Sequence, residues 1–123
     1  MYKIEKMPPS IEIGYTGETG IRTIEIDMSA WMEKNPDGVP CLVHIRPGEA
    51  ESDAYVAGTD FDDNILSWTI QDTDLGTAEG EGQAQIWLVE TEDETVTMRR
   101  TSKTVKTKVH KAIQIPEEEE EET

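Results

Sequence analysis

The chain has 123 residues, a length that suits a single domain. Its 27 acidic and 11 basic residues give a formal net charge of −16, and a field of this sign argues against nucleic-acid binding because it repels phosphate backbones. Cys41 is the only cysteine, so an intrachain disulfide is excluded, and no apolar run approaches the ~18 residues that a membrane span needs.

Short segments of alternating apolar residues follow one another along the chain, separated by turn signals rich in Gly, Pro, Asp and Asn. The segment 29–38 changes period, and there Ser29 can cap a short helical turn that Pro36 ends. Trp31 in this turn is expected to cover one end of the fold. The alternating patterns predict strands in the segments 11–15, 21–28, 41–46, 54–59, 65–71, 83–89, 95–100 and 104–113.

Seven or eight short strands separated by turns predict an all-β fold. The expected architecture is a small antiparallel β-sandwich, immunoglobulin-like or jelly-roll-like, with one or two short helical turns. An open β-barrel is the alternative. We expect residues 1–115 to form this single domain, and the acidic tail 116–123, which holds six consecutive glutamates, to be solvated and disordered.

The parity of each expected strand assigns its side chains to the core or to the solvent. In the segment 41–46 the alternation points Cys41 inward and His44 outward. Same-parity apolar residues predict one common core, which contains Ile24, Ile26, Val43, Ile45, Leu66, Trp68, Ile70, Ile86 and Leu88.

The segment 60–64 has alternating acids, as a calcium loop does. However, Ile65 and Gln71 stand where an EF-hand needs its glycine and its last glutamate. The segment therefore predicts an ordinary polar hairpin loop, and we expect no metal there.

A second acidic segment, 72–76, has an equally structural interpretation. Asp72 or Thr73 can cap a single helical turn, and Gly76 can end that turn in the left-handed conformation. Leu75 would then fold inward over the end of the sandwich. We expect no cofactor of any kind.

No constellation of residues predicts catalysis. His44 and His110 both point outward by parity whereas Cys41 points inward, which argues against a Cys–His nucleophilic pair. Carboxylate pairs are many among 27 acids, and nothing singles out one pair for glycoside hydrolysis. We expect no enzymatic activity.

The residues that best suit contact with a partner are Trp87, Lys106 and Lys108. Trp87 has the parity opposite to that of the core residues beside it, so it lies either in a second buried face or on a contact surface. Lys106 and Lys108 point outward from a terminal strand (104–112) that we expect to be an edge. Lysines there either guard the edge against aggregation or dock on an acidic neighbour.

Three stretches are similar, in order and spacing, to one known family. They are YTGETGIRTIEIDMSAWMEKNPDG (15–38), IRPGE (45–49) and ILSWTIQDTDLGTAEGEGQAQIWL (65–88). Together they resemble the N-terminal domain of baseplate upper proteins and tail-fibre proteins from phages of Gram-positive bacteria, over roughly residues 10–113. In that family an opening strand pair leads to a turn that contains Trp. A strand ending in Arg-Pro, a Leu-Ser/Thr-Trp-Thr strand, an acidic turn and a Gly-rich bend follow.

The resemblance implies a structural phage or prophage tail component without catalytic activity, which anchors a receptor-binding fibre or adaptor to the baseplate. It implies other tail and baseplate proteins as partners, a homo-oligomer with a trimer favoured, and a place in the virion after synthesis in the bacterial host cytoplasm. The acidic, glycine-containing segment 72–82 then corresponds to an inter-strand corner of the family. The alternative is a carbohydrate-binding β-sandwich, which would use exposed Trp or Tyr side chains on one face.

Overall fold

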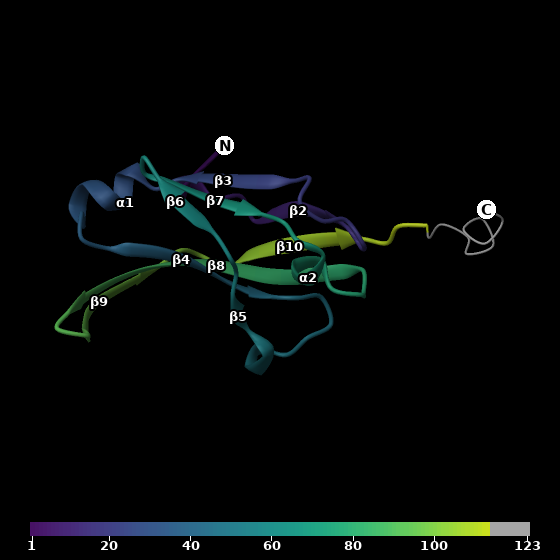
Figure 1. Cartoon of the computed structure of the whole chain (residues 1–123). Helices are drawn as coiled ribbons and strands as arrows, with labels where there is room; N and C mark the ends of the chain where they lie inside the picture. Colours follow the sequence, from purple (N-terminus) through teal and green to yellow (C-terminus); the bar gives the residue numbers. More distant parts are fainter. Residues whose placement is uncertain (114–123) are drawn as a thin grey trace, which may run out of the picture.

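The structure is a computed structural model that describes residues 1–113, and it consists of two stacked β-sheets (Figure 1). The small sheet has the order β1-β3-β7-β6, with bounds Tyr2–Lys3, Thr23–Asp27, Ile65–Thr69 and Asp60–Asp62. The large sheet has the order β2-β10-β8-β4-β5, with β9 as a further partner of β8. Its bounds are, in that order, Ser10–Tyr15, Val105–His110, Gly80–Glu92, Val39–Ile45 and Tyr55–Val56, and Thr95–Thr101 for β9.

The expected all-β sandwich is thus confirmed, and only short helical turns accompany the strands. None of the helices in residues 1–113 is long and apolar enough to cross a membrane. The acidic tail 116–123 lies outside the described residues. The turns are α1 (Ser29–Lys34), α2 (Asp72–Leu75) and the 3₁₀ turns η1 (Ile4–Lys6) and η2 (Glu51–Asp53).

The cap of α1 differs from the expected one. Ser29 is the first helical residue, and the carboxylate of Asp27 does the capping. Its Oδ1 accepts hydrogen bonds from the backbone N–H of Ser29 at 2.9 Å and from the Ser29 hydroxyl at 2.5 Å. A carboxylate at this end of a helix satisfies a free N–H and interacts favourably with the helix dipole. Trp31 is buried at this end of the sandwich, as expected.

The cap of α2 also comes from a different residue than expected. Oδ2 of Asp74 accepts a hydrogen bond from the backbone N–H of Gln71 at 2.9 Å, so capping by Asp72 or Thr73 is wrong. An acid at the third helical position can reach back to the N–H that precedes the helix. The turn itself, its inward-folded Leu75 and a positive φ of 73° at the following glycine are as expected.

Two strand pairings are parallel, which departs from the expected antiparallel sandwich. β1 pairs with β3 and β2 pairs with β10, so the first 15 residues supply one edge strand to each sheet. Because β10 lies between β2 and β8, the expectation that the segment 104–112 forms an edge is wrong. The physical reason is that Ile11 and Ile13 of β2 have to be buried, and pairing beside the last strand places them in the core.

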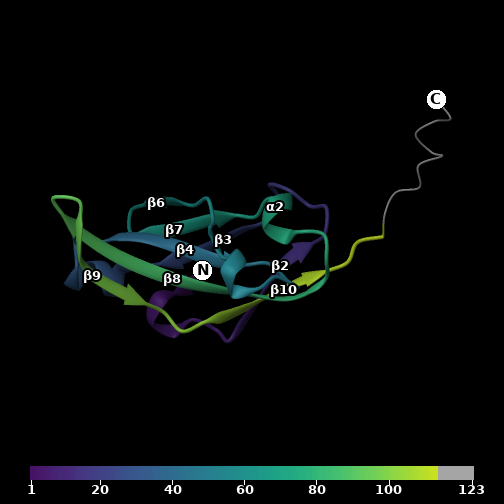
Figure 2. The same ribbon diagram turned by 90° about the horizontal axis from the view of Figure 1, so that it is seen from below.

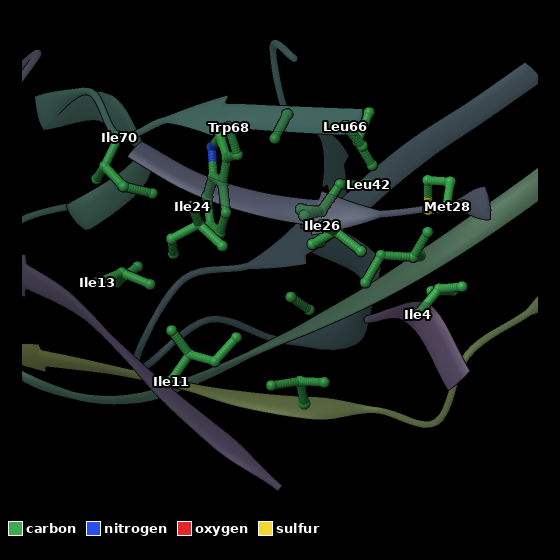
Figure 3. Packing of buried hydrophobic residues seen from close by; sticks show 14 of the residues in the cluster. Ile4, Ile11, Ile13, Ile24, Ile26, Met28, Leu42, Leu66, Trp68 and Ile70 are labelled. Atoms are coloured by element: carbon green, nitrogen blue, oxygen red, sulfur yellow. The ribbon is translucent and has the colours of Figure 1, made fainter. Parts of the chain in front are cut away.

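The core lies between the two sheets, whose apolar side chains point toward one another (Figure 3). It contains the expected residues of β3, β7 and β8. In β4, however, Leu42 and His44 are buried while Val43 and Ile45 are only half-buried on the outer side, so the expected register was wrong there. Leu42 pairs with Ile86, which fixes this parity. The error arises because both faces of β4 carry apolar side chains.

Two tight hairpins shape the ends of the sheets. Asp63 and Asn64 join β6 to β7 with φ of 52° and 64°, so the segment 60–64 forms a hairpin as expected. Asp93 and Glu94 join β8 to β9 with φ of 51° and 66°. Two consecutive residues with positive φ match the twist of paired strands. The hairpin of β8 and β9 extends beyond the body of the sandwich in both views (Figures 1 and 2).

Candidate functional site

The outward side of the large sheet carries a row of apolar side chains, which we call the outer apolar face. On β4 and β8 these side chains alternate with the buried ones and so point away from the core. Cross-strand pairing places Cys41 beside Trp87 and Val39 beside Val89. Val39 and Val56 are 66% and 65% exposed. Contiguous apolar surface of this kind marks interaction sites in soluble proteins. The face consists of Val39, Cys41, Val43, Val56, Trp87 and Val89.

Trp87 is half-buried in the middle of this face and not in a second core. It pairs with Cys41 on one side and with Thr101 on the other. Figure 1 shows the hairpin of β8 and β9 and the loop with η2 both extending on the outward side of the large sheet. Burial raises the pKa of the neighbouring Cys41 thiol, which disfavours its thiolate at neutral pH.

Basic side chains lie on the same side of the large sheet as the outer apolar face. Arg99 pairs with Val89, and Lys106 and Lys108 point outward from β10. Nζ of Lys106 lies 3.9 Å from a carboxylate oxygen of Glu81, with both side chains exposed. Residues 99–113 contain six of the eleven basic residues of the chain and no acid. Two of the three interface residues expected from the sequence, Lys106 and Lys108, thus share one face with the third, Trp87.

A buried polar network lies on the opposite, inward side of the large sheet, and sequence reasoning missed it. His44 is fully buried; its Nδ1 lies 2.9 Å from the hydroxyl of Tyr55, and its Nε2 lies 3.0 Å from the hydroxyl of Thr107. Tyr55 donates a hydrogen bond to Oδ1 of Asp74 at 2.5 Å. Oδ2 of Asp74 accepts a hydrogen bond from Nε1 of Trp68 at 3.2 Å.

The single hydroxyl proton of Tyr55 decides the protonation of this network. Because that proton is donated to Asp74, Nδ1 of His44 must carry its own proton and donate it to Tyr55. Nε2 of His44 then accepts a hydrogen bond from Thr107. Burial lowers the pKa of His44 to about 4, which keeps the imidazole neutral. Burial and the hydrogen bond to Asp74 raise the pKa of Tyr55 far above its usual value.

A hydroxyl beside an imidazole is the arrangement of a nucleophile and its base, but this one has no access for a substrate. Thr107 is 1% exposed. A Cβ added to Gly82 would lie 2.8 Å from the Thr107 hydroxyl oxygen, so the backbone of β8 packs directly on it. The network therefore acts as a structural clamp that joins β4, β5, β7, β10 and α2.

Arg46 reinforces the same corner from outside. Its guanidinium carbon lies 4.1 Å from the centroid of the Tyr55 ring, its Nε donates to the carbonyl of Thr73, and its Nη1 lies 3.3 Å from Glu49. This corner includes Arg46 and Pro47, which follow β4, and the acidic turn α2. Within residues 1–113, no group of three or more His, Cys, Asp or Glu side chains is arranged to hold a metal ion.

Comparison with known proteins gives no family. No protein-family model and no curated protein matches this chain. Within residues 1–113, the outer apolar face is the surface whose exposed apolar side chains best suit contact with a partner.

Proposed function

We propose that this protein is a non-enzymatic structural component of a phage or prophage tail, which docks on a neighbouring subunit of the tail through the outer apolar face. In this proposal it serves as the baseplate-anchoring domain of a receptor-binding fibre or as an adaptor, and its place is the virion. The sequence resemblance over roughly residues 10–113 supports the class of protein. The β-sandwich fold agrees with that class.

The observation that carries the proposal is the outward position of Trp87 among apolar neighbours. Tryptophan is enriched at protein interfaces, where it contributes much of the binding free energy when it is covered. Arg99 lies beside Val89 of the same face, and Lys106 and Lys108 lie farther along the same side of the sheet, so these side chains suit acidic groups of a partner. Such charges speed association and set specificity, while the apolar centre provides affinity.

The alternative of a carbohydrate-binding module finds less support in the arrangement of the aromatic side chains. Trp31 and Trp68 are buried. The exposed Tyr15 belongs to β2, where it pairs with His110, and the exposed Phe61 belongs to β6 of the small sheet. Within residues 1–113, Trp87 therefore has no aromatic neighbour on its face with which to form a sugar-binding row.

The test is incorporation into particles. A phage or induced prophage that encodes the chain would be deleted for it and complemented with wild-type protein, with Trp87→Ser, or with the double change Lys106→Glu and Lys108→Glu. Purified particles would then be probed for the protein by quantitative immunoblot. A matched control reverses two exposed lysines elsewhere, Lys6→Glu and Lys34→Glu.

We expect the wild-type protein and the control to co-purify with tails, and both face variants to be depleted by at least about tenfold. Circular dichroism of the purified variants would check that they are folded. Absence of the wild-type protein from particles would refute the tail assignment. Incorporation of both face variants at wild-type level would refute the role of the outer apolar face.

A further inference from the structure

The strand β9 leaves an edge of the large sheet open. It pairs with β8 on one side, and within residues 1–113 no strand pairs with its other side. Its seven residues make it the longest of the strands at an open edge, because β1, β2, β5 and β6 have between two and six. Its hairpin with β8 also extends beyond the body of the sandwich (Figures 1 and 2). Unpaired N–H and C=O groups at such an edge suit the addition of an extended segment.

The hydrogen bonds to β8 show which backbone groups of β9 are free. The N–H of Ser102 donates to the carbonyl of Ile86 at 2.9 Å, so these two residues form a hydrogen-bonded pair. In an antiparallel ladder, hydrogen-bonded pairs alternate with non-hydrogen-bonded pairs. Arg100 is therefore bonded to β8, whereas Arg99 and Thr101 direct their N–H and C=O groups toward the open edge. All three of these residues are exposed.

The charge changes along the length of this hairpin. Residues 92–94, all acidic, lie at the turn, and Glu90 pairs with the middle of β9. Arg99 and Arg100 lie at the other end of β9, and within residues 1–113 neither forms an ion pair. The guanidinium carbon of Arg100 lies 4.6 Å from the centroid of the Trp31 ring. Stacking on an aromatic ring positions this side chain and leaves its N–H groups available to a carboxylate.

Two copies of β9 would bring like charges together if they paired with each other. An antiparallel pairing has to set Arg99 or Thr101 of one copy opposite Arg99 or Thr101 of the other, because these residues point their backbone groups outward. With Arg99 opposite Thr101, Arg100 faces its own copy. With Thr101 opposite itself, Arg99 faces Lys103, and the remaining register sets Arg99 opposite itself. Like charges directly opposite each other destabilise a strand pair, so the edge favours a segment of different sequence.

We propose that the open edge of β9 binds an extended segment of a partner protein, which joins the large sheet as a further strand and carries acidic side chains opposite Arg99 and Arg100. The inference rests on the proposed function for the docking role of this side of the molecule, and it adds the chemistry of the segment that docks. Backbone hydrogen bonds provide affinity in such a strand addition, and side chains provide specificity. Because Thr101 pairs with Trp87, a residue opposite Thr101 also extends the row of the outer apolar face.

The test is an NMR titration of the ¹⁵N-labelled full chain with a peptide of the sequence TEEVTV, acetylated and amidated at its ends. Laid antiparallel to residues 96–101, this peptide sets its two glutamates opposite Arg100 and Arg99. Its counterpart TKKVTV carries lysines at the same two positions. At about 0.1 M salt the Debye length is about 10 Å, so distant acids of the chain are screened while the charges beside β9 still act.

Two methylated peptides and two protein variants separate backbone recognition from charge recognition. N-methylation of the first and third residues of TEEVTV removes the N–H groups that would bond to Thr101 and Arg99. N-methylation of the second and fourth residues is the control, because those N–H groups would point away from β9. On the protein, Arg99→Glu with Arg100→Glu reverses the charge at the edge. Lys3→Glu with Lys111→Glu makes the same change of net charge at exposed positions outside β9.

We expect TEEVTV to shift the amide resonances of residues 98–101 and to bind at least about tenfold more tightly than TKKVTV. Methylation of the first and third residues should weaken binding by at least about tenfold, and methylation of the second and fourth should not. The arginine variant should reverse the preference and bind TKKVTV more tightly, whereas the lysine control should behave as the wild type does. Circular dichroism checks that both variants are folded, and the methylated peptides test the wild-type chain itself.

Three results would overturn the inference. They are the absence of shifts at β9 with millimolar TEEVTV, equal binding of the two peptides to the wild-type chain, and a wild-type chain that dimerises through this edge. The titration involves no phage particle, and incorporation into particles could still succeed in each of these cases. Failure of the inference is therefore distinguishable from failure of the tail assignment.

Discussion

Nε2 of His44 lies 3.0 Å from the hydroxyl of Thr107, although a third strand separates the strands that carry them. His44 pairs with Ala84 of β8, and Thr107 pairs with Gly82 of the same strand. Small residues on β8 leave room for the two longer side chains to meet across it. The hydrogen bond therefore ties three neighbouring strands of the large sheet together inside the core.

The stability of the fold should fall between about pH 6.5 and about pH 4 because His44 resists protonation. Its pKa is lowered from 6.5 to about 4 in the folded state, so the unfolded chain binds the proton first. The stabilisation is complete above about pH 6.5 and is lost as the pH falls toward 4, with a total of about 3 kcal/mol. Urea unfolding midpoints measured across this range would show the slope.

Two substitutions separate His44 from other titrating groups. His44→Gln should lower stability at neutral pH but remove the slope in this window. His110→Gln should keep the slope, because it leaves the buried His44 and its partners unchanged. Glu18, whose pKa is lowered from 4.5 by its hydrogen bond to Arg22, contributes as the pH falls through and below 4.5, so it overlaps only the acidic end of this window. An unchanged slope in His44→Gln would show that burial of this imidazole does not control the pH dependence.

Tyr55→Phe should destabilise the fold by about 1–3 kcal/mol. The change leaves Oδ1 of Asp74 and Nδ1 of His44 without their hydrogen-bond partner, and buried polar groups left unpaired carry the full desolvation cost. Tyr15→Phe is the matched control, because Tyr15 is 43% exposed. Chemical denaturation of both variants at neutral pH provides the measurement, and equal effects at the two positions would contradict a structural role for the network.

The strands with strong alternation could be predicted from the sequence, but the pairing of distant segments could not. Leu66, Trp68 and Ile70 alternate with polar residues, so the buried side of β7 follows from its pattern. β4 has apolar residues on both faces, so its pattern does not show which face is buried. Parity therefore assigned His44 to the solvent, although its side chain is buried. Only the positions of Tyr55 and Thr107, which lie 11 and 63 residues away, make burial of His44 favourable.

The residues proposed for an interface were likewise predictable in part from local pattern and in part not. Local parity points Lys106 outward and places Trp87 on the side opposite to Ile86 and Leu88, and in the structure both side chains lie on the outward side of the large sheet. That they share one face of one sheet depends on the order of the strands. The segment 104–112 was wrongly expected to be an edge strand for the same reason. The parallel partner of β10 is β2, from the other end of the chain, and no local pattern identifies a partner at that distance in sequence.

Replacing Trp68 or Trp87 should reduce the stability of the fold by very different amounts. Trp68→Ala removes a side chain that is 2% exposed and that donates to Asp74, so we expect a loss of about 3–5 kcal/mol. Trp87→Ala truncates a half-buried side chain on the outer apolar face, and we expect a loss of about 1 kcal/mol or less. Thermal unfolding of both variants would test this. A larger loss for Trp87→Ala would mean that this face belongs to the core.

Gly82→Ala should be strongly destabilising because a methyl group has no space at this position. A Cβ there would lie 2.2 Å from the carbonyl oxygen of Ile45 and 2.8 Å from the Thr107 hydroxyl oxygen, and the nearer contact is with backbone, which cannot rotate away. We expect a loss of at least about 3 kcal/mol, at the upper end of what overpacking costs. Gly58→Ala is the control, because no atom lies within 4 Å of its added Cβ.

The pH dependence gives this substitution a second readout. If Gly82→Ala still folds, β8 has to move away from β4 and β10, and the hydrogen bond between His44 and Thr107 is broken. His44 would then become easier to protonate, so the variant should lose part of the stability slope between about pH 6.5 and about pH 4. Urea unfolding at several pH values measures both effects. A variant of wild-type stability with an intact slope would show that close packing of β8 against its neighbours is not what holds the buried network in place.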